Sequence, residues 1–180
     1  MQIRDTEVRY GAVTRGLHWI IAALIAWQFL GVILEGALGD QNALASAVAG
    51  FHSSQGFVLF VLIVIRIVWS LMNRADRPDH GAGLLGRAAR MGHFALYALM
   101  FIVPALALLR AYGSGRGLNA FGLVQILPAT GERVSWMVTP ASVLHGPLAW
   151  TLLVLIAGHI AMVVVHRLVL RDGVLTRMAG

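Results

Sequence analysis

Residues Leu144–Val165 read LHGPLAWTLLVLIAGHIAMVVV, an apolar stretch that carries one histidine near each end. His145 and His159 are fourteen residues apart. A helix advances about 100° and 1.5 Å per residue, so the second imidazole returns to nearly the same face about 21 Å further along the axis. Since the hydrocarbon core of a membrane is about 30 Å thick, one helix of this kind can hold two cofactors, one toward each face of a bilayer.

The composition is that of an integral membrane protein. Hydrophobic residues make up 58% of the 180 residues and charged residues 12%, against about 25% charged residues in soluble domains. Four apolar stretches are each long enough to cross a bilayer as a helix. We therefore predict an all-α membrane protein with one domain, residues 1–180, built as a four-transmembrane-helix bundle. The four stretches are Leu17–Leu38, Leu44–Leu71, Phe94–Tyr112 and Ser142–Leu170.

The basic residues, all fourteen of them arginine, are unevenly distributed between the apolar stretches. The N-terminal segment, the second connection and the C-terminal segment are rich in arginine, whereas the first connection has none. Cytoplasmic segments carry an excess of basic residues, so we expect both termini to face the cytoplasm. The net charge of +6 therefore serves membrane topology, and its division among separate segments argues against a nucleic-acid partner.

This orientation predicts how the histidines pair. The first stretch enters from the cytoplasm, so His18 lies near the cytoplasmic edge with His159. The second and fourth stretches enter from the opposite side, so His52 and His145 lie together there. Each pair can bind one haem iron from two sides. Because the chain has no cysteine, which excludes covalent haem attachment and cysteine-ligated iron–sulfur clusters, we predict two non-covalently bound haem b groups.

Two alternatives remain open for these histidines. His166 lies seven residues past His159, on nearly the same face and about 10.5 Å further along, so His18 can pair with either. We favour His159 as the ligand and expect His166 to contact a propionate or a quinone. Histidines that only hydrogen-bond to neighbouring helices would instead indicate a non-redox scaffold. His80 lies in a polar connection, where we expect it to be solvated.

Arg66 lies inside the second apolar stretch, where an arginine needs a partner or must extend toward the interface. Its depth matches that of the cytoplasmic haem, so a haem propionate is the partner we expect. Glycines also accompany the histidines: Gly56 follows His52 by one turn, and Gly146 and Gly158 adjoin the two histidines of the fourth stretch. Small neighbours suit a flat, wide macrocycle, although ordinary helix packing also uses glycine.

Several short motifs resemble those of the bacterial cytochrome b561 family of four-helix, di-haem membrane proteins, and in particular its superoxide oxidase type, a superoxide:ubiquinone oxidoreductase. The resemblance covers nearly the whole chain, and the histidine set is its most specific part. The motifs are Leu17–His18–Trp19, His52 with Gly56, Gly92–His93, the run from Tyr112–Gly113 to Ala120–Phe121–Gly122, the histidines at 145, 159 and 166, and Leu175–Thr176–Arg177–Met178.

The resemblance implies a multi-pass protein of the bacterial inner membrane. It also implies the same haem ligands as the orientation of the spans, His18 with His159 for one haem and His52 with His145 for the other. It implies that superoxide is oxidised on the periplasmic side and that ubiquinone is reduced. Arg110, Arg116 and Arg133 would then form a positive funnel for superoxide. Contacts with lipid headgroups, or an ion pair with Glu132, are the alternative roles for these arginines.

The quinone site is less well defined by the resemblance. His93 is expected to line that site or to contact a propionate. The quinone itself is expected in the lipid-facing interface near His93, Arg90, Trp19 or His166. The sequence does not indicate which of these faces binds it.

Two other redox functions fit the same ligand pattern. One is the cytochrome b subunit of a hydrogenase or formate dehydrogenase complex, which needs a soluble partner. The other is a passive electron-transfer module that receives electrons from a periplasmic donor. The pattern itself makes no prediction of oligomeric state.

Overall fold

The computed structural model describes residues 2–79, 81 and 83–179. Within these residues it has four apolar helical segments long enough to cross a membrane, Ala12–Leu38, Ala43–Met72, Gly83–Gly113 and Ser135–Leu170. The predicted all-α, four-helix membrane architecture is therefore confirmed. His80, which we expected to be solvated, lies outside the described residues.

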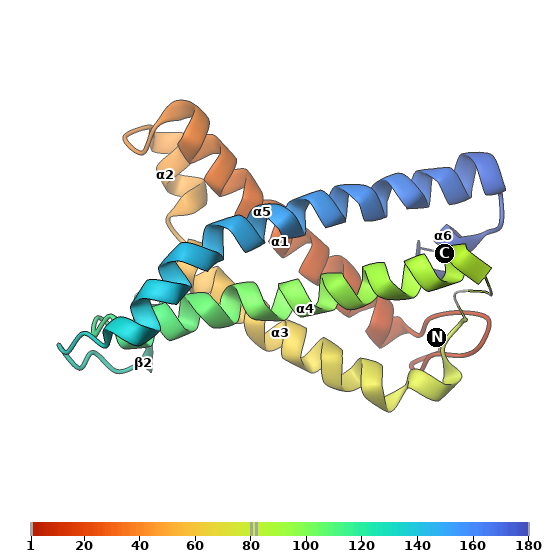
Figure 1. Cartoon of the computed structure of the whole chain (residues 1–180), viewed down its shortest axis with the longest axis horizontal. Coiled ribbons are helices and arrows are strands. Elements are labelled where there is room, and N and C mark those ends of the chain that lie inside the picture. Colours follow the sequence, from red (N-terminus) through yellow and green to blue (C-terminus); the bar gives the residue numbers. More distant parts are fainter. Residues whose placement is uncertain (1, 80, 82, 180) are drawn as a thin grey trace.

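The first long helix crosses the last two obliquely in the view of Figure 1, and both termini lie at one end of the helical bundle. We call this the terminal end, and we call the other the hairpin end because a two-stranded antiparallel sheet, β1 (Leu118–Ala120) with β2 (Val124–Leu127), lies there. The helices in chain order are α1 (Ala12–Leu38), α2 (Ala43–Ala49), α3 (His52–Met72), α4 (Gly83–Gly113), α5 (Ser135–Val165) and α6 (Val174–Ala179), with a 3-10 turn η1 (Arg74–Asp76) and a π-helical turn η2 (His166–Leu170).

The second apolar stretch is broken into α2 and α3, where the sequence predicted one continuous helix. The Asn42 side chain caps α2 by accepting hydrogen bonds from the backbone N–H groups of Leu44 (3.0 Å) and Ala45 (3.3 Å). The chain then leaves helical geometry at Phe51, with φ −98° and ψ 8°. A hydropathy average does not report such a break, because the short polar run His52–Gln55 beside it lies between two long apolar stretches. The break makes His52 the first residue of α3.

The third and fourth spans start earlier than their hydropathy indicates. α4 begins at Gly83 instead of Phe94, and α5 begins at Ser135 instead of Ser142. The added turns are more polar than the apolar stretches that follow them. α5 also includes Pro140 and Pro147, which membrane helices tolerate where other groups satisfy the freed backbone atoms.

The buried core is small and lies between α1 and α3. Ile21 and Ile25 of α1 pack against Leu59 and Ile63 of α3, and Ile63 is fully buried. α5 packs mainly against α4, and only 6% of its most apolar window is buried inside the protein. Most of the apolar surface of α5 is therefore available to lipid or to a cofactor between the helices.

The N-terminal segment is fastened to the terminal end by a buried carboxylate. Asp5, 3% exposed, accepts hydrogen bonds from Arg77 Nε (2.9 Å) and from the backbone N–H of Gly11 (2.8 Å). The same guanidinium also donates to Ser70 Oγ. A side chain at Gly11 would collide with the backbone of Ile3 and Arg4. These contacts position the start of α1, which carries His18.

Candidate functional site

Two pairs of imidazoles face each other between helices. His18 of α1 and His159 of α5 have ring centroids 6.5 Å apart at an interplanar angle of 62°. His52 of α3 and His145 of α5 have centroids 6.3 Å apart at 78°. The first pair lies toward the terminal end and the second toward the hairpin end. Because the two α5 residues are fourteen positions apart, the pairs are separated by about 21 Å along that helix.

The spacing within each pair fits a metal ion held between two imidazole nitrogens. A metal–imidazole bond is about 2.0 Å, and the nitrogen lies roughly 1.1 Å from the ring centre, so two opposed ligands place their centroids about 6.2 Å apart. Both pairs match this value. Among the described residues no group of three or more histidine, aspartate or glutamate side chains is arranged to hold a metal. Two imidazoles at this spacing suit a metal whose remaining ligands come from a macrocycle.

Each α5 histidine has a neighbouring glycine that adjoins open space. A Cβ atom added at Gly146 or at Gly158 would meet no atom within 4 Å. Gly56 instead lies against another helix, because an added Cβ there would be 3.3 Å from the side-chain nitrogen of Gln28. Gln28 donates from that nitrogen to the backbone oxygen of His52 at 3.0 Å. Gly56 thus makes room for a contact between α1 and α3, whereas the glycines of α5 adjoin open space.

The hairpin-end pair is already oriented for ligation. Nδ1 of His145 lies 3.0 Å from the backbone oxygen of Val103 on α4. A carbonyl oxygen can only accept, so this contact places the imidazole proton on Nδ1 and leaves Nε2 as the basic nitrogen. A ligating histidine ordinarily has such a partner on its other nitrogen.

The terminal-end pair is oriented by Arg66. Its Nη2 lies 3.3 Å from Nδ1 of His18, and its Nε donates to the hydroxyl of Tyr97 at 3.0 Å. Arg66 therefore points into the bundle and contacts the histidine pair, rather than extending to the interface. A guanidinium only donates, so in this arrangement His18 accepts at Nδ1 and carries its proton on Nε2.

His93 and His166 have different surroundings. The ring of His93 lies 5.4 Å from that of His159, which is too close for the two to bind opposite sides of one metal. Its Nδ1 lies 2.7 Å from the backbone oxygen of Ala89. His166 begins η2 and contacts Asp172, with Nδ1 2.6 Å from Oδ2. This hydrogen bond lowers the pKa of the Asp172 carboxyl. The structure thus brings His18 to His159 and turns His166 toward the C-terminal segment.

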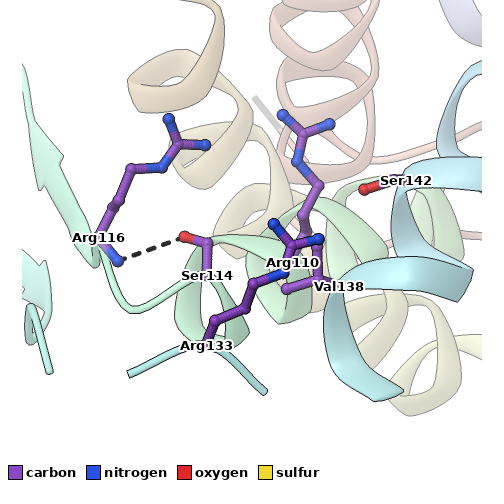
Figure 2. Close-up of a pocket in the computed structure, with 6 residues that line it drawn as sticks. All are labelled: Arg110, Ser114, Arg116, Arg133, Val138 and Ser142. Atoms are coloured by element: carbon purple, nitrogen blue, oxygen red, sulfur yellow. Dashed lines mark hydrogen bonds between the residues drawn. The ribbon is translucent and has the colours of Figure 1, made fainter. Parts of the chain in front are cut away.

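The three arginines expected to form a funnel line one cavity of about 590 Å³ at the hairpin end (Figure 2). Arg110 comes from the last turn of α4, Arg116 from the following loop, and Arg133 from two residues before α5. Within the described part of the chain, no carboxylate lies in ion-pair distance of the three guanidiniums, and the alternative pairing with Glu132 is not formed. Ser114, Val138 and Ser142 complete the lining.

Sequence reasoning missed three residues that position this machinery. Tyr97, which holds Arg66, lies four residues after His93, and this helical spacing was the signal available. Ser54 lies two residues after His52, and its hydroxyl accepts the backbone N–H of Phe121 at 2.9 Å. Phe121 has a left-handed φ of 55°, so this bond holds an unusual turn of the hairpin loop against α3. No pattern indicated Asp172.

Fold and site together define a helical membrane protein with a matched imidazole pair toward each end of its bundle. The chain belongs to the prokaryotic cytochrome b561 family, whose model matches residues 9–180. It is 29% identical over 181 residues to cytochrome b561 homolog 2 of Escherichia coli (strain K12), covering 100% of this chain and 96% of that protein. It is 25% identical over 172 residues to a probable superoxide oxidase CybB of Yersinia pestis, covering 94% and 95%.

Membership of this family establishes the general function of the protein. The protein is a multi-pass bacterial membrane cytochrome that binds haem b and takes part in membrane electron transfer.

Proposed function

We propose that the protein oxidises superoxide at its hairpin end and reduces ubiquinone, with two haem b groups connecting the two sites. The observation that carries this proposal is the presence of two imidazole pairs with the same near-6.3 Å spacing toward opposite ends of one bundle. A single pair would serve one redox centre on one side. Two pairs provide a path for electrons through the membrane.

His52 and His145 would hold one haem, and His18 and His159 the other. Haem b bound in these places supplies one-electron redox chemistry. Two imidazole ligands leave no open position on the iron, which favours electron transfer over oxygen binding. His145 is held in the ligating tautomer by Val103. His18 reaches the same tautomer when Arg66 moves from the neutral Nδ1 to an anionic partner, and a haem propionate is the partner we propose.

The arginine cavity supports superoxide as the donor. Its three positive charges lie at the same end as the His52–His145 pair. A positive field raises the encounter rate of a small anion, by factors of about 10 to 10³ in favourable cases. Two superoxide ions would each lose one electron and leave as oxygen. One quinone would take up both electrons and two protons to become the quinol.

A second cavity supports a quinone site at the terminal end. It has a volume of about 240 Å³ and is lined by Arg15 and Trp19 of α1 together with Met178 and Ala179 of α6. Trp19 contacts the ring of His18 edge-on, with centroids 5.1 Å apart. A quinone ring in this cavity would lie one side chain away from the His18–His159 pair. This location supports Trp19 among the four neighbours of the quinone that the sequence left open.

We propose that the terminal end faces the cytoplasm and that residues 1–180 act as one domain. The arginine distribution supports this orientation. A fluorescent protein that matures only in the cytoplasm, fused to the C-terminus, should then be bright. A periplasmic reporter that is active at the C-terminus would reverse the orientation and place the arginine cavity in the cytoplasm.

The deciding experiment exposes the purified, oxidised holoprotein to a steady source of superoxide in the presence of ubiquinone. The b-haem absorption bands should become reduced faster than spontaneous dismutation consumes superoxide, and one quinol should form for every two superoxide ions. Added superoxide dismutase should abolish the reduction. No haem reduction in this assay, together with stoichiometric co-purification of a large periplasmic enzyme, would favour the cytochrome b subunit of a larger complex.

A further inference from the structure

We infer that the arginine cavity at the hairpin end is a binding site for a phosphate group, supplied either by an anionic glycerophospholipid headgroup or by phosphate in solution. The cavity has about 590 Å³, within the range of about 300–1,000 Å³ that is typical of sites for organic ligands. A diatomic anion would occupy only a small part of it.

The charge of the cavity calls for an anion that stays bound. Arg110, Arg116 and Arg133 bring three positive charges to one space, and the described residues place no carboxylate within ion-pair distance of them. Three like charges repel one another, and at this end of the protein they are not neutralised from within. An anion with several oxygens would relieve this repulsion by binding between guanidiniums of the cavity.

The backbone around the cavity is held in place before any ligand arrives. Gly115 has φ +73°, and a Cβ there would lie 2.5 Å from the backbone oxygen of Glu132. This glycine therefore lets the two ends of the loop between α4 and α5 come into contact. The N–H of Gly131 donates to Gly115 O at 3.0 Å, and the N–H of Val134 donates to Gly113 O at 2.8 Å. These contacts bring the arms of the loop that carry Arg116 and Arg133 together.

Two serines also line the cavity, and the hydroxyl hydrogen of Ser114 is already donated within the protein. Ser114 Oγ accepts the backbone N–H of Arg116 at 3.3 Å and donates to Ala111 O at 2.8 Å, so it fixes the start of the Arg116 side chain (Figure 2). Ser142 contributes a further hydroxyl from α5. Guanidinium forks bind the oxygens of phosphate through paired hydrogen bonds, and a tetrahedral oxyanion can be approached by three of them at once.

The surroundings favour the phospholipid source. Trp136 at the start of α5 is 67% exposed, and Tyr112 at the end of α4 is 44% exposed. Exposed tryptophan and tyrosine at helix ends mark the headgroup level of a membrane. Val143 and Leu144 are exposed on α5 directly after Ser142. A phosphate in the cavity would therefore lie at headgroup depth, with apolar surface next to it for acyl chains.

This inference does not depend on superoxide as the electron donor. A phosphodiester carries one negative charge, so the occupied cavity would keep a net charge of about +2 and could still attract a small anion. Binding and electron transfer have separate readouts, so failure of one proposal leaves the other testable.

The experiment uses haem-loaded, full-length protein in two arms. In the lipid arm, native mass spectrometry follows protein released from phosphatidylcholine nanodiscs that contain a minor fraction of phosphatidylglycerol. In the phosphate arm, delipidated protein in a neutral detergent is titrated with inorganic phosphate by calorimetry. The variant is Arg133→Gln, whose side chain is exposed and precedes α5. The matched control is Arg9→Gln, an exposed arginine at the terminal end.

We expect one phosphatidylglycerol per wild-type chain, retained by Arg9→Gln and weakened about tenfold in Arg133→Gln, because a charge-assisted hydrogen bond contributes about a factor of ten or more. Saturable phosphate binding with the same variant pattern, but no lipid retention, would assign the site to free phosphate. The proposal is overturned if neither ligand binds saturably, or if both variants lose binding equally. Unchanged haem spectra in both variants show that the comparison is between folded proteins.

Discussion

Nη2 of Arg66 lies 3.3 Å from Nδ1 of His18, so a permanently charged group on α3 touches one of the imidazoles proposed to bind haem. The same guanidinium is held by the hydroxyl of Tyr97 and lies 5.4 Å from the centre of its ring. A cation in such a place stabilises an added electron nearby. Arg66 therefore connects the packing of α1, α3 and α4 to the redox properties of the terminal-end site.

Arg66→Gln should lower the reduction potential of the terminal-end haem. A unit charge about 10 Å from the iron, at an effective dielectric constant of about 20, contributes about 1.7 kcal/mol, which is about 70 mV for one electron. Spectroscopic redox titration measures this shift. Arg66→Lys keeps the charge and should recover most of the potential. Equal shifts at both haems would contradict a local effect.

Each proposed ligand should be required for one haem and not for the other. His18→Ala and His159→Ala should remove the terminal-end haem, while His52→Ala and His145→Ala should remove the hairpin-end haem. Haem quantification should fall from about two to about one per chain in each case, because each haem would lose one of the two histidines that would hold it.

His166→Ala is the matched control for these four variants, because its imidazole contacts Asp172 instead of the pair. It should keep both haems. Loss of a haem in His166→Ala with retention of both in His159→Ala would reverse the assignment.

The superoxide reaction should depend on ionic strength. Raising the salt from about 0.01 M to about 0.15 M shortens the Debye length from about 30 Å to about 8 Å, so the rate of haem reduction should fall several-fold in stopped-flow measurements. Arg110→Gln and Arg133→Gln should lower the rate at low salt and flatten this dependence. Reduction by an uncharged chemical donor serves as the control and should change little. If the variant that combines Arg110→Gln with Arg133→Gln kept the full salt dependence, these arginines would not be the groups that attract superoxide.

Breaking the Asp5–Arg77 ion pair should loosen the N-terminal segment. Asp5 has a fully buried side chain, and that of Arg77 is 19% exposed. Removing one partner of a buried pair costs about 3–5 kcal/mol, and the exposed part of Arg77 reduces this to about 2–4 kcal/mol. Asp5→Ala should increase hydrogen exchange at residues 2–12. Adding Arg77→Ala should cost less than the sum of the single changes, because no unpaired charge then remains. Additive effects would show that the two residues act independently.

The N-terminal segment should also respond to alkaline pH through Tyr10. Burial raises the pKa of this hydroxyl above 10.0, despite the opposing effect of Arg77. The protonated form is thus favoured in the folded state, so its contribution is fully present below pH 10 and is lost as pH rises toward the folded-state pKa. The ultraviolet titration difference between wild type and Tyr10→Phe should give a midpoint above 10. A midpoint at or below 10 would mean that the residue is solvated.

Much of the fold could be predicted from hydropathy alone. The four spans are each long and apolar, and this property does not depend on how they pack. Helix ends and interruptions were predicted less well. α5 begins seven residues earlier than its apolar stretch, and the break at Phe51 lies inside one predicted span. These features depend on local backbone conformation, such as the non-helical φ and ψ of Phe51, which an average over a window does not record.

The histidine pairing followed from order along the chain. With four antiparallel spans, residues near equal depths must meet, and this reasoning brought His52 to His145 without a structure. It could not choose between His159 and His166 as neighbours of His18, because both lie on nearly the same face of one helix. The choice rests on the π-helical turn η2 and on Asp172, which turn His166 away.

The sequence by itself therefore determined the membrane class, the number of spans and the position of each paired histidine along its span, because periodicity and hydropathy act along a single helix. Only the tertiary structure decided which side chains touch across helices. It brought Arg66 to His18 and Tyr97, and it gathered Arg110, Arg116 and Arg133 around one cavity. The reason is that contacts between helices depend on crossing angles, loop geometry and helix breaks, none of which has a fixed spacing in the sequence.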